Sequence, residues 1–345
     1  MNPKKALFVI NNPGGFRAIL PVLPLIESYQ LFVTEQISSL VPESQSKQTL
    51  PYYLTEADIL KILEQQKPSV LIVGTSVPSS KGGNLESLFI QAAFKKGIPS
   101  ISVLDHWCHY QERYTLHKTL DALPQIICIM DTKAKKEMLS LGFPESILSV
   151  TGQPAFDSLL SNAKDREQCL TERVNRFPVS SDQKLITFVS EPVAEDYGNK
   201  RGYTQHEALE ILKFVMESIP NTRIAIKKHP RESNDFFSEF IINNNDFFLS
   251  DTAPRDLVLS SDLVIGMTSI LLIESAMMGI PTISFQPGIS LDSDYAMMIQ
   301  PIPVISGVNP LKEAITSSSN LNSLTFPYHE TNATQKVADQ IKQFM

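Results

Sequence analysis

Residues 261–288 constrain the fold more than any other part of the chain. They read SDLVIGMTSILLIESAMMGIPTISFQPG: a short apolar run, a turn of small residues, an apolar helix and a second apolar run. This order is typical of a βαβ unit, in which a helix connects two parallel strands. The free N–H groups at the start of such a helix suit a phosphate, and its one acid, Glu274, suits the hydroxyls of a ribose.

A second loop, rich in positive charge, follows another apolar run. Lys227, Lys228, His229 and Arg231 come directly after a predicted strand at 223–226. Because parallel strands end at one edge of their sheet, this loop and the helix start are expected at the same edge. They predict a pocket for a nucleotide mono- or diphosphate. Its predicted residues are Lys228, His229, Arg231, Gly266, Thr268, Ser269 and Glu274.

Apolar runs alternate with helix-like segments along the whole chain, which predicts an α/β protein with parallel sheets. A length of 345 residues favours two domains. We expect two Rossmann-like domains, at 1–165 and 183–329, facing across a cleft at the carboxyl ends of their strands. The polar segment 161–183 is predicted to contain a short amphipathic helix, and its end is expected to be the linker between the two domains. A helix at 330–345 is expected to pack back on the first domain.

The periodicity also predicts the individual elements. The predicted strands are 6–10, 70–73, 100–104, 126–130, 147–150, 185–189, 223–226, 247–249, 263–265, 282–285 and 303–305. The predicted helices are 17–29, 56–66, 85–96, 133–141, 155–162, 205–218, 235–242, 255–260, 269–278, 311–317 and 334–344.

Composition excludes several classes of protein. A net charge of −7 argues against a nucleic-acid binder, since a phosphate backbone favours a basic face. Apolar runs fall short of the ~20 residues that span a bilayer, and the amino terminus enters a strand pattern without a signal peptide, so a cytoplasmic location is expected. The cysteines, Cys108, Cys128 and Cys169, are odd in number and scattered, which argues against disulfides and a cysteine metal site.

The densest polar and aromatic cluster follows the predicted strand 100–104. It comprises Asp105, His106, Trp107, His109, Tyr110, Glu112 and Arg113. Asp105 is the first choice for a general base, with His106 and His109 behind it, because that role needs a group that titrates near neutral pH. Trp107 would offer a flat surface to a sugar. The alternative is a packed loop in which Asp105 and Arg113 form a structural pair.

Three further loops are expected at the cleft, although each could equally be mobile surface. The first contains Asn12, Gly14, Gly15 and Arg17, where glycines permit close approach of a ligand. The others span 74–84 and 190–203, the latter including Glu191. The residues predicted to line the cleft or contact an acceptor are Asn12, Gly14, Gly15, Arg17, Trp107, Arg113 and Glu191. No metal site is predicted, because Asp292 and Asp294 lack a strand setting and no zinc ligand set has sensible spacing.

Four segments in this order resemble the glycosyltransferase-B (GT-B) superfamily, which includes the UDP-N-acetylglucosamine 2-epimerases. They are 11–27 (NNPGGFRAILPVLPLIE), 150–159 (VTGQPAFDSL), 227–233 (KKHPRES) and 261–281. The His-Pro loop and the Thr-Ser helix start are similar to those of transferases that use CMP-sialate, CMP-Kdo or CDP-glycerol donors. The resemblance implies that His229, Thr268 and Ser269 hold donor phosphates. It implies a ribose contact for Glu274, as in UDP-sugar members.

The resemblance implies a metal-independent glycosyltransferase without a cofactor. Its partners would be a nucleotide sugar, with UDP and CMP types both open, and a surface glycan or glycolipid acceptor, which leaves peripheral membrane association open. A UDP-sugar 2-epimerase or hydrolase of the same fold ranks lower, because this chain has LDHWCHYQERY where the epimerases have a Glu-Ala-Gly-Leu-Arg motif. A non-catalytic nucleotide-binding or assembly protein is the third alternative.

Overall fold

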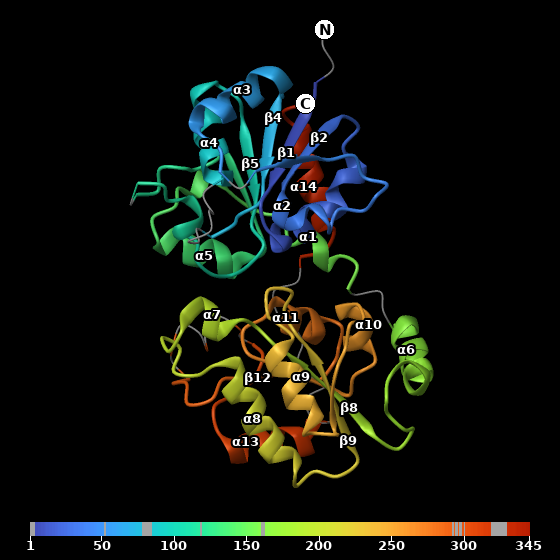
Figure 1. The fold of residues 1–345 in the computed structure, drawn as a ribbon. Coiled ribbons are helices and arrows are strands. Elements are labelled where there is room, and N and C mark those ends of the chain that lie inside the picture. Colours follow the sequence, from blue (N-terminus) through green and yellow to red (C-terminus); the bar gives the residue numbers. More distant parts are fainter. Residues whose placement is uncertain are drawn as a thin grey trace. The chain divides into compact units, whose positions relative to one another are not determined.

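The computed structural model describes residues 4–51, 53–77, 85–117, 119–159, 163–291, 293, 296, 299, 301–318 and 330–345. The chain forms two compact units, coloured along the sequence in Figure 1. Unit 1 comprises Met1–Ser158 and Pro327–Met345, and unit 2 comprises Leu159–Phe326. Unit 2 is therefore inserted into the sequence of unit 1.

Unit 1 contains a parallel sheet of seven strands in the order β3-β2-β1-β4-β5-β6-β7. The strands are β1 (Ala6–Ile10), β2 (Tyr29–Thr34), β3 (Gln48–Leu50), β4 (Val70–Val73), β5 (Ser100–Val103), β6 (Ile126–Ile129) and β7 (Leu148–Val150). The helices are α1 (Pro13–Ile19), η1 (Leu20–Leu25), α2 (Glu35–Ser38), α3 (Glu56–Gln66), α4 (Leu85–Lys95), η2 (Glu112–Tyr114), α5 (Thr132–Ser140), η3 (Glu145–Ile147), η4 (Pro154–Phe156) and α14 (Ala333–Lys342), where η marks 3-10 helices.

Unit 2 contains a parallel sheet of six strands in the order β10-β9-β8-β11-β12-β13. The strands are β8 (Lys184–Val189), β9 (Thr222–Lys227), β10 (Phe247–Leu249), β11 (Leu263–Gly266), β12 (Thr282–Phe285) and β13 (Val304–Ile305). The helices are α6 (Ala163–Arg176), α7 (Val193–Tyr197), α8 (Gln205–Met216), α9 (Asp235–Ile242), α10 (Pro254–Leu259), α11 (Ile270–Met277) and α13 (Val308–Thr316).

Helices cover both faces of each sheet, so the central strands are buried and nearly continuously apolar. Every residue of β1 and of β4 is buried. The carboxyl-terminal helix α14 adds Val337, Ala338 and Ile341 to the core of unit 1. These features confirm the predicted α/β class with two Rossmann-like units and parallel sheets.

Two predicted helices are wrong in extent. The helix predicted at 17–29 is instead α1, the 3-10 helix η1 and the start of β2, because Pro21 and Pro24 lack the N–H groups that an α-helix needs. Of the helix predicted at 155–162, only η4 is present among the residues that the structure describes, which exclude 160–162. Strands β2 and β3 were not predicted.

The first unit ends earlier in the sequence than the expected boundary at 165, and α6 lies within unit 2. Arg173 of α6 forms an ion pair of 2.7 Å with Asp262, next to β11. Helix α6 also packs against α10, so the polar segment is mostly a structural helix of the second unit. Within the described part of the chain, every helix is too short or too polar to cross a membrane.

Candidate functional site

In unit 1, the carboxyl ends of β1, β4 and β5 bring three polar segments together. Asn12 caps α1 through a 2.7 Å hydrogen bond that its side chain accepts from the Gly15 N–H. Gly14 and Gly15 therefore form the first turn of a helix and not a loop. A Cβ atom on Gly14 would lie 2.2 Å from Oδ2 of Asp105, so glycine lets α1 approach the end of β5. Arg17, in the same helix, is exposed.

Asp105 and Arg113 form a buried ion pair at this edge. The Arg113 guanidinium donates to Oδ1 of Asp105 at 2.7 Å, and Thr75 donates to the same oxygen at 3.0 Å. Arg113 also donates to the carbonyl of Cys108 at 2.9 Å and to the carbonyl of Thr75. Asp105 and Arg113 therefore form the structural pair that was the alternative to a catalytic cluster. The predicted acceptor contact of Arg113 is wrong, because its side chain is buried and its N–H groups are used inside the unit.

Trp107 is also not a sugar platform. Only 6% of its surface is exposed. Its indole N–H donates to Asp131 at 2.7 Å, and its ring stacks on Phe156 with centroids 6.1 Å apart. The prediction failed because the sequence gives no signal for Asp131 or Phe156 as partners. Trp107 joins the β5 loop to the end of β6 and to η4.

Glu86 is a buried acid at this edge that the sequence analysis missed. It lies in the first turn of α4 and accepts hydrogen bonds from the backbone N–H of Asn11 at 3.0 Å and of Ser76 at 2.6 Å. Burial raises the pKa of Glu86, although these hydrogen bonds oppose the shift. The carboxyl thus connects the ends of β1 and β4. An acid within a mostly apolar helix, LESLFIQAAFK, is the feature of the sequence that could have marked Glu86 as a site residue.

The turn after β7 contributes a buried amide to the same edge. Gly152 has a φ of +88°, and a Cβ there would lie 2.8 Å from Ala333 at the start of α14, so this position requires glycine. Gln153 donates to the carbonyl of Asp105 at 3.3 Å. Its buried Oε1 has no hydrogen-bond partner among the described residues. An O–H donor would fit that atom.

The two candidate histidines of this unit differ in their surroundings. His106 lies with Nδ1 3.2 Å from Sγ of Cys108. Burial would lower the pKa of His106, but the Cys108 sulfur outweighs it and raises the pKa. His109 has 32% of its side chain exposed, and burial lowers its pKa. His109 is therefore neutral at neutral pH and fits a proton acceptor better than His106 does.

In unit 2, β9, β8 and β11 are neighbours, so their carboxyl ends bring the two predicted phosphate segments to one edge. Glu232 connects the first of these segments to β8. Its carboxylate accepts from the His229 N–H at 2.6 Å and from the Ser190 hydroxyl at 2.8 Å. Glu232 is buried and was not predicted as a site residue. It fixes the backbone of the His-Pro loop.

His229 is a neutral donor in this arrangement. Burial and the neighbouring Arg231 lower its pKa to about 4. Its Nδ1 accepts from the Arg231 N–H at 3.2 Å, which leaves the proton on Nε2. At neutral pH the ring can therefore donate a hydrogen bond to an anion but adds no positive charge.

The cations of the same loop are largely bound by groups within unit 2. Arg231 makes two hydrogen bonds to Asp196, of 2.7 and 2.6 Å. Lys227 donates to the carbonyl of Thr252 at 2.8 Å. Lys228 donates to the carbonyl of Glu232 at 2.8 Å, and within the described residues it forms no ion pair, although the Glu232 carboxylate interacts with its charge. Lys228 is thus the better candidate for a phosphate contact.

A carboxylate occupies the predicted anion position at the start of α11. Glu191 accepts from the Thr268 N–H at 2.6 Å and from the Thr268 hydroxyl at 2.8 Å. Arg201 donates to the same hydroxyl at 2.9 Å and lies over the Tyr197 ring at 3.8 Å. Glu191 was expected to contact an acceptor. It instead binds within unit 2, and Arg201, which was not among the predicted site residues, lies beside it.

The other predicted residues of the segment 261–281 lie at the end of β11 and in the first turns of α11. Ser269 caps α11, accepting from the Leu271 N–H at 3.3 Å, and Gly266 ends β11. Glu274 lies in α11 with only 4% of its surface exposed. Its contact with a ribose stays a prediction.

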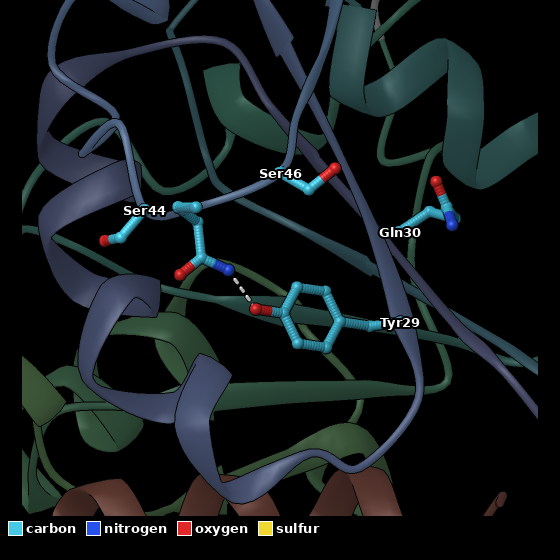
Figure 2. A pocket seen from close by; sticks show the side chains of 5 residues that line it. Tyr29, Gln30, Ser44 and Ser46 are labelled. Carbon is cyan, nitrogen blue, oxygen red and sulfur yellow. Dashed lines mark hydrogen bonds between the residues drawn. The ribbon is translucent and has the colours of Figure 1, made fainter.

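A polar hollow in unit 1 lies away from these residues. It has a volume of about 360 Å³, and its lining, shown in Figure 2, consists of Tyr29, Gln30, Ser44, Gln45 and Ser46. Gln45 donates to the Tyr29 hydroxyl across it. Tyr29 and Gln30 begin β2, so the hollow is at the amino end of that strand, whereas α/β proteins bind ligands at carboxyl ends.

Some predictions fall on residues that the structure does not describe. Asp292, Asp294 and residues 78–84 of the 74–84 loop lie outside the described residues. Among those that are described, no group of three or more His, Cys, Asp or Glu side chains could hold a metal ion.

Two Rossmann-like units with parallel sheets define the GT-B fold, and solved structures share it over almost the full chain. A UDP-GlcNAc 2-epimerase from Methanocaldococcus jannaschii, in complex with UDP-GlcNAc and UDP, matches with a TM-score of 0.71 and 16% identity, covering 98% of this chain and 99% of that one. MurG from Acinetobacter baumannii matches with 0.62 and 14%, covering 99% and 100%. The wall teichoic acid polymerase TagF matches with 0.62 and 14%, covering 99% and 89%.

The sequence itself places the chain in a family. Residues 50–321 match DUF354, described as a protein of unknown function, and the chain belongs to that family. A comparison with curated proteins found no match.

Proposed function

We propose that this protein is a nucleotide-sugar enzyme that transfers a sugar from an activated donor to a hydroxyl group of a surface glycan or glycolipid precursor. Unit 2 binds the donor and unit 1 supplies the acceptor contacts and the base. The protein acts without a metal and in the cytoplasm. The GT-B fold and the polar edges of the two units support this proposal.

One observation carries the proposal: the carboxylate of Glu191 is bound where a donor phosphate is expected. The main-chain N–H and the hydroxyl of Thr268 donate to it, and the Arg201 guanidinium, which donates to the same hydroxyl, interacts with its charge. These are the groups that bind phosphate oxygens at the ends of parallel strands. A position that holds one anion through two donors beside a positive charge has the chemistry to hold another.

The remaining residues of unit 2 receive roles from their geometry. The Nε2–H of His229 donates a hydrogen bond to a phosphate oxygen, and Lys228 adds positive charge. Preorganised donors of this kind stabilise the negative charge that develops as a nucleotide leaves. Thr268 and Ser269 contribute hydroxyls at the start of α11, and Glu274 takes the ribose.

In unit 1, His109 is proposed as the group that accepts the proton from the acceptor hydroxyl, with Asp105 as the second choice. His109 is partly exposed and neutral at neutral pH, whereas one oxygen of Asp105 is already bound by Arg113 and Thr75.

Calorimetry of the purified protein with UDP, CMP and CDP tests the donor site first. Binding of at least one nucleotide is expected, with a Kd at least tenfold weaker in His229→Ala, since a hydrogen bond to a charged group contributes about 1.5–3 kcal/mol. Donor hydrolysis and glycan extension should fall together in the same variant. Heat from none of the three would reject the enzyme and favour the non-catalytic alternative.

A second candidate reaction, 2-epimerisation or hydrolysis of a UDP-sugar, is favoured by the acids of unit 1. Glu86, Asp105 and Asp131 all lie at the carboxyl ends of its strands, and burial raises the pKa of Glu86 and of Asp131. Carboxyl groups with raised pKa values suit acid–base chemistry on a sugar. Turnover of UDP-GlcNAc without any acceptor would support this reaction, and strict dependence on an acceptor would exclude it.

A further inference from the structure

Cys108 forms a close pair with His106 in the loop between β5 and η2. Its Sγ lies 3.2 Å from Nδ1 of His106, and Cys108 as a residue is only partly buried. The next residue, His109, has a φ of +56°, which turns the chain sharply after the cysteine. The pair is thus fixed within a short, bent segment.

Arg113 holds this loop in place. Its guanidinium donates to the carbonyl of Cys108 at 2.9 Å and to Asp105 at 2.7 Å, and its own N–H donates to the carbonyl of His109 at 3.2 Å. Because Arg113 is buried, these contacts fix the backbone on both sides of the cysteine. The thiol and the imidazole therefore do not need to reorganise to meet.

The charges around the sulfur favour the thiolate. Burial would raise the pKa of the Cys108 thiol, but His106 and Arg113 outweigh it and lower the pKa. Burial raises the pKa of Tyr110, which stays neutral and donates to Glu137 at 2.7 Å. Besides Cys108 and His106 themselves, the titratable groups that face the pair are Arg113, Tyr110, Asp105 and His109.

The other two cysteines provide internal controls. Cys128 lies in β6 with 1% of its surface exposed, and burial raises the pKa of its thiol to about 12. Cys169 is buried in α6. Of the three cysteines, Cys108 alone is only partly buried and lies beside a base.

We propose that Cys108 and His106 form a thiolate–imidazolium pair, and that Cys108 is a modification site for small electrophiles and peroxides. In the reaction with hydrogen peroxide, the sulfur attacks one oxygen, the S–O bond forms and the O–O bond breaks. The sulfur is oxidised by two electrons to a sulfenic acid. The hydroxide that leaves takes the proton of the His106 imidazolium and becomes water. This property does not depend on the proposed use of nucleotides.

The test measures alkylation of each cysteine in the folded, full-length protein. Short pulses of iodoacetamide between pH 5 and 9 are followed by mass spectrometry of the cysteine peptides. Cys108 should react fastest, with half of its maximal rate reached below the ~8.5 of an ordinary thiol. His106→Gln keeps the size of the side chain without its charge, and should slow Cys108 at pH 7 roughly tenfold.

A half-maximal pH at or above ~8.5, preferential labelling of Cys128 or Cys169, or an unchanged rate in His106→Gln would overturn the proposal. If His106→Gln does not fold, the thiolate absorbance at 240 nm decides instead. Its titration in the wild type minus that in Cys108→Ser should show a transition below ~8.5, and a transition at or above that pH would overturn the proposal. After brief peroxide treatment, a sulfenic-acid probe should label Cys108 alone.

Discussion

The two units have similar parallel sheets, each with polar residues at the carboxyl ends of its strands, but the polar groups at these two edges differ. At the edge of unit 1, buried acids bind groups of neighbouring loops. Glu86 accepts hydrogen bonds from the loops after β1 and β4, and Asp105 pairs with Arg113. At the edge of unit 2, the Glu191 carboxylate accepts from the N–H and the hydroxyl of Thr268, and the His-Pro loop presents the neutral imidazole of His229. The first edge is a network of buried acids, and the second is the proposed anion site. Under the proposed function, the same fold therefore serves two tasks.

Removing Arg113 should damage unit 1 most. Arg113→Met leaves the buried Asp105 carboxylate without its partner, which costs about 3–5 kcal/mol of stability when a buried pair is broken. Urea unfolding followed by Trp107 fluorescence measures it, because the only tryptophan of the chain lies in this unit. The double variant Asp105→Asn with Arg113→Met should recover part of the loss. A loss below about 1 kcal/mol would break the view of this edge as a rigid network.

Gly14→Ala tests how tightly α1 is packed on the same network. The new Cβ would meet Oδ2 of Asp105 at 2.2 Å, so α1 or the carboxylate must move, at a cost of about 1–3 kcal/mol. The same fluorescence assay applies.

Glu191→Gln tests whether the anion site of unit 2 is replaceable. If a donor phosphate displaces this carboxylate, the neutral side chain competes less, and the Kd for the bound nucleotide should fall roughly tenfold. Calorimetry measures it, with the exposed Glu217→Gln as a control for net charge. Weaker binding in Glu191→Gln would show that the carboxylate contacts the ligand directly and would break the contrast between the two edges.

The neutral state of His229 predicts a small pH effect on stability. Its pKa is about 4 in the folded chain and about 6.5 when unfolded, so the unfolded state binds more protons below pH 6.5. Stability is complete above pH 6.5 and is lost as the pH falls toward 4. By pH 5 the loss from this residue is on the order of 1 kcal/mol after allowance for solvent screening.

Urea unfolding by circular dichroism at pH 7 and pH 5 checks this effect. The difference between the two pH values should be smaller in His229→Gln than in the wild type. An identical pH response of the wild type and His229→Gln would show that folding leaves the pKa of His229 at its ordinary value, so that the imidazole is charged at pH 5 in the folded chain.

The sequence predicted the strands and helices that follow from periodicity, but it did not predict contacts between residues far apart in the chain. The strands at 6–10, 70–73, 247–249 and 282–285 were predicted with their observed bounds, because buried parallel strands are continuous apolar runs. Strand β2 was missed because its sequence YQLFVT follows a run that also suits a helix, and only the prolines within 20–25 mark the break.

The candidate site shows the same division. The residue types at strand ends, such as Asp105 and Thr268, could be selected because the βα order places them at one edge. Their partners could not be predicted in the same way. Glu191 binds a residue 77 positions later, and Glu86 binds a backbone group 75 positions earlier, and no local pattern encodes such pairs. The burial of Trp107 likewise depends on Asp131 and Phe156, which lie in other elements.

The insertion of unit 2 into unit 1 sets an order of events during synthesis. A ribosome makes residues 159–326 before α14, whose side chains at Val337 and Ile341 complete the core of the first unit. The second unit can therefore fold while the first still lacks a helix and exposes the apolar surface against η1 that α14 later covers. A nascent chain stalled near residue 326 should accordingly bind chaperones through its earliest-made half.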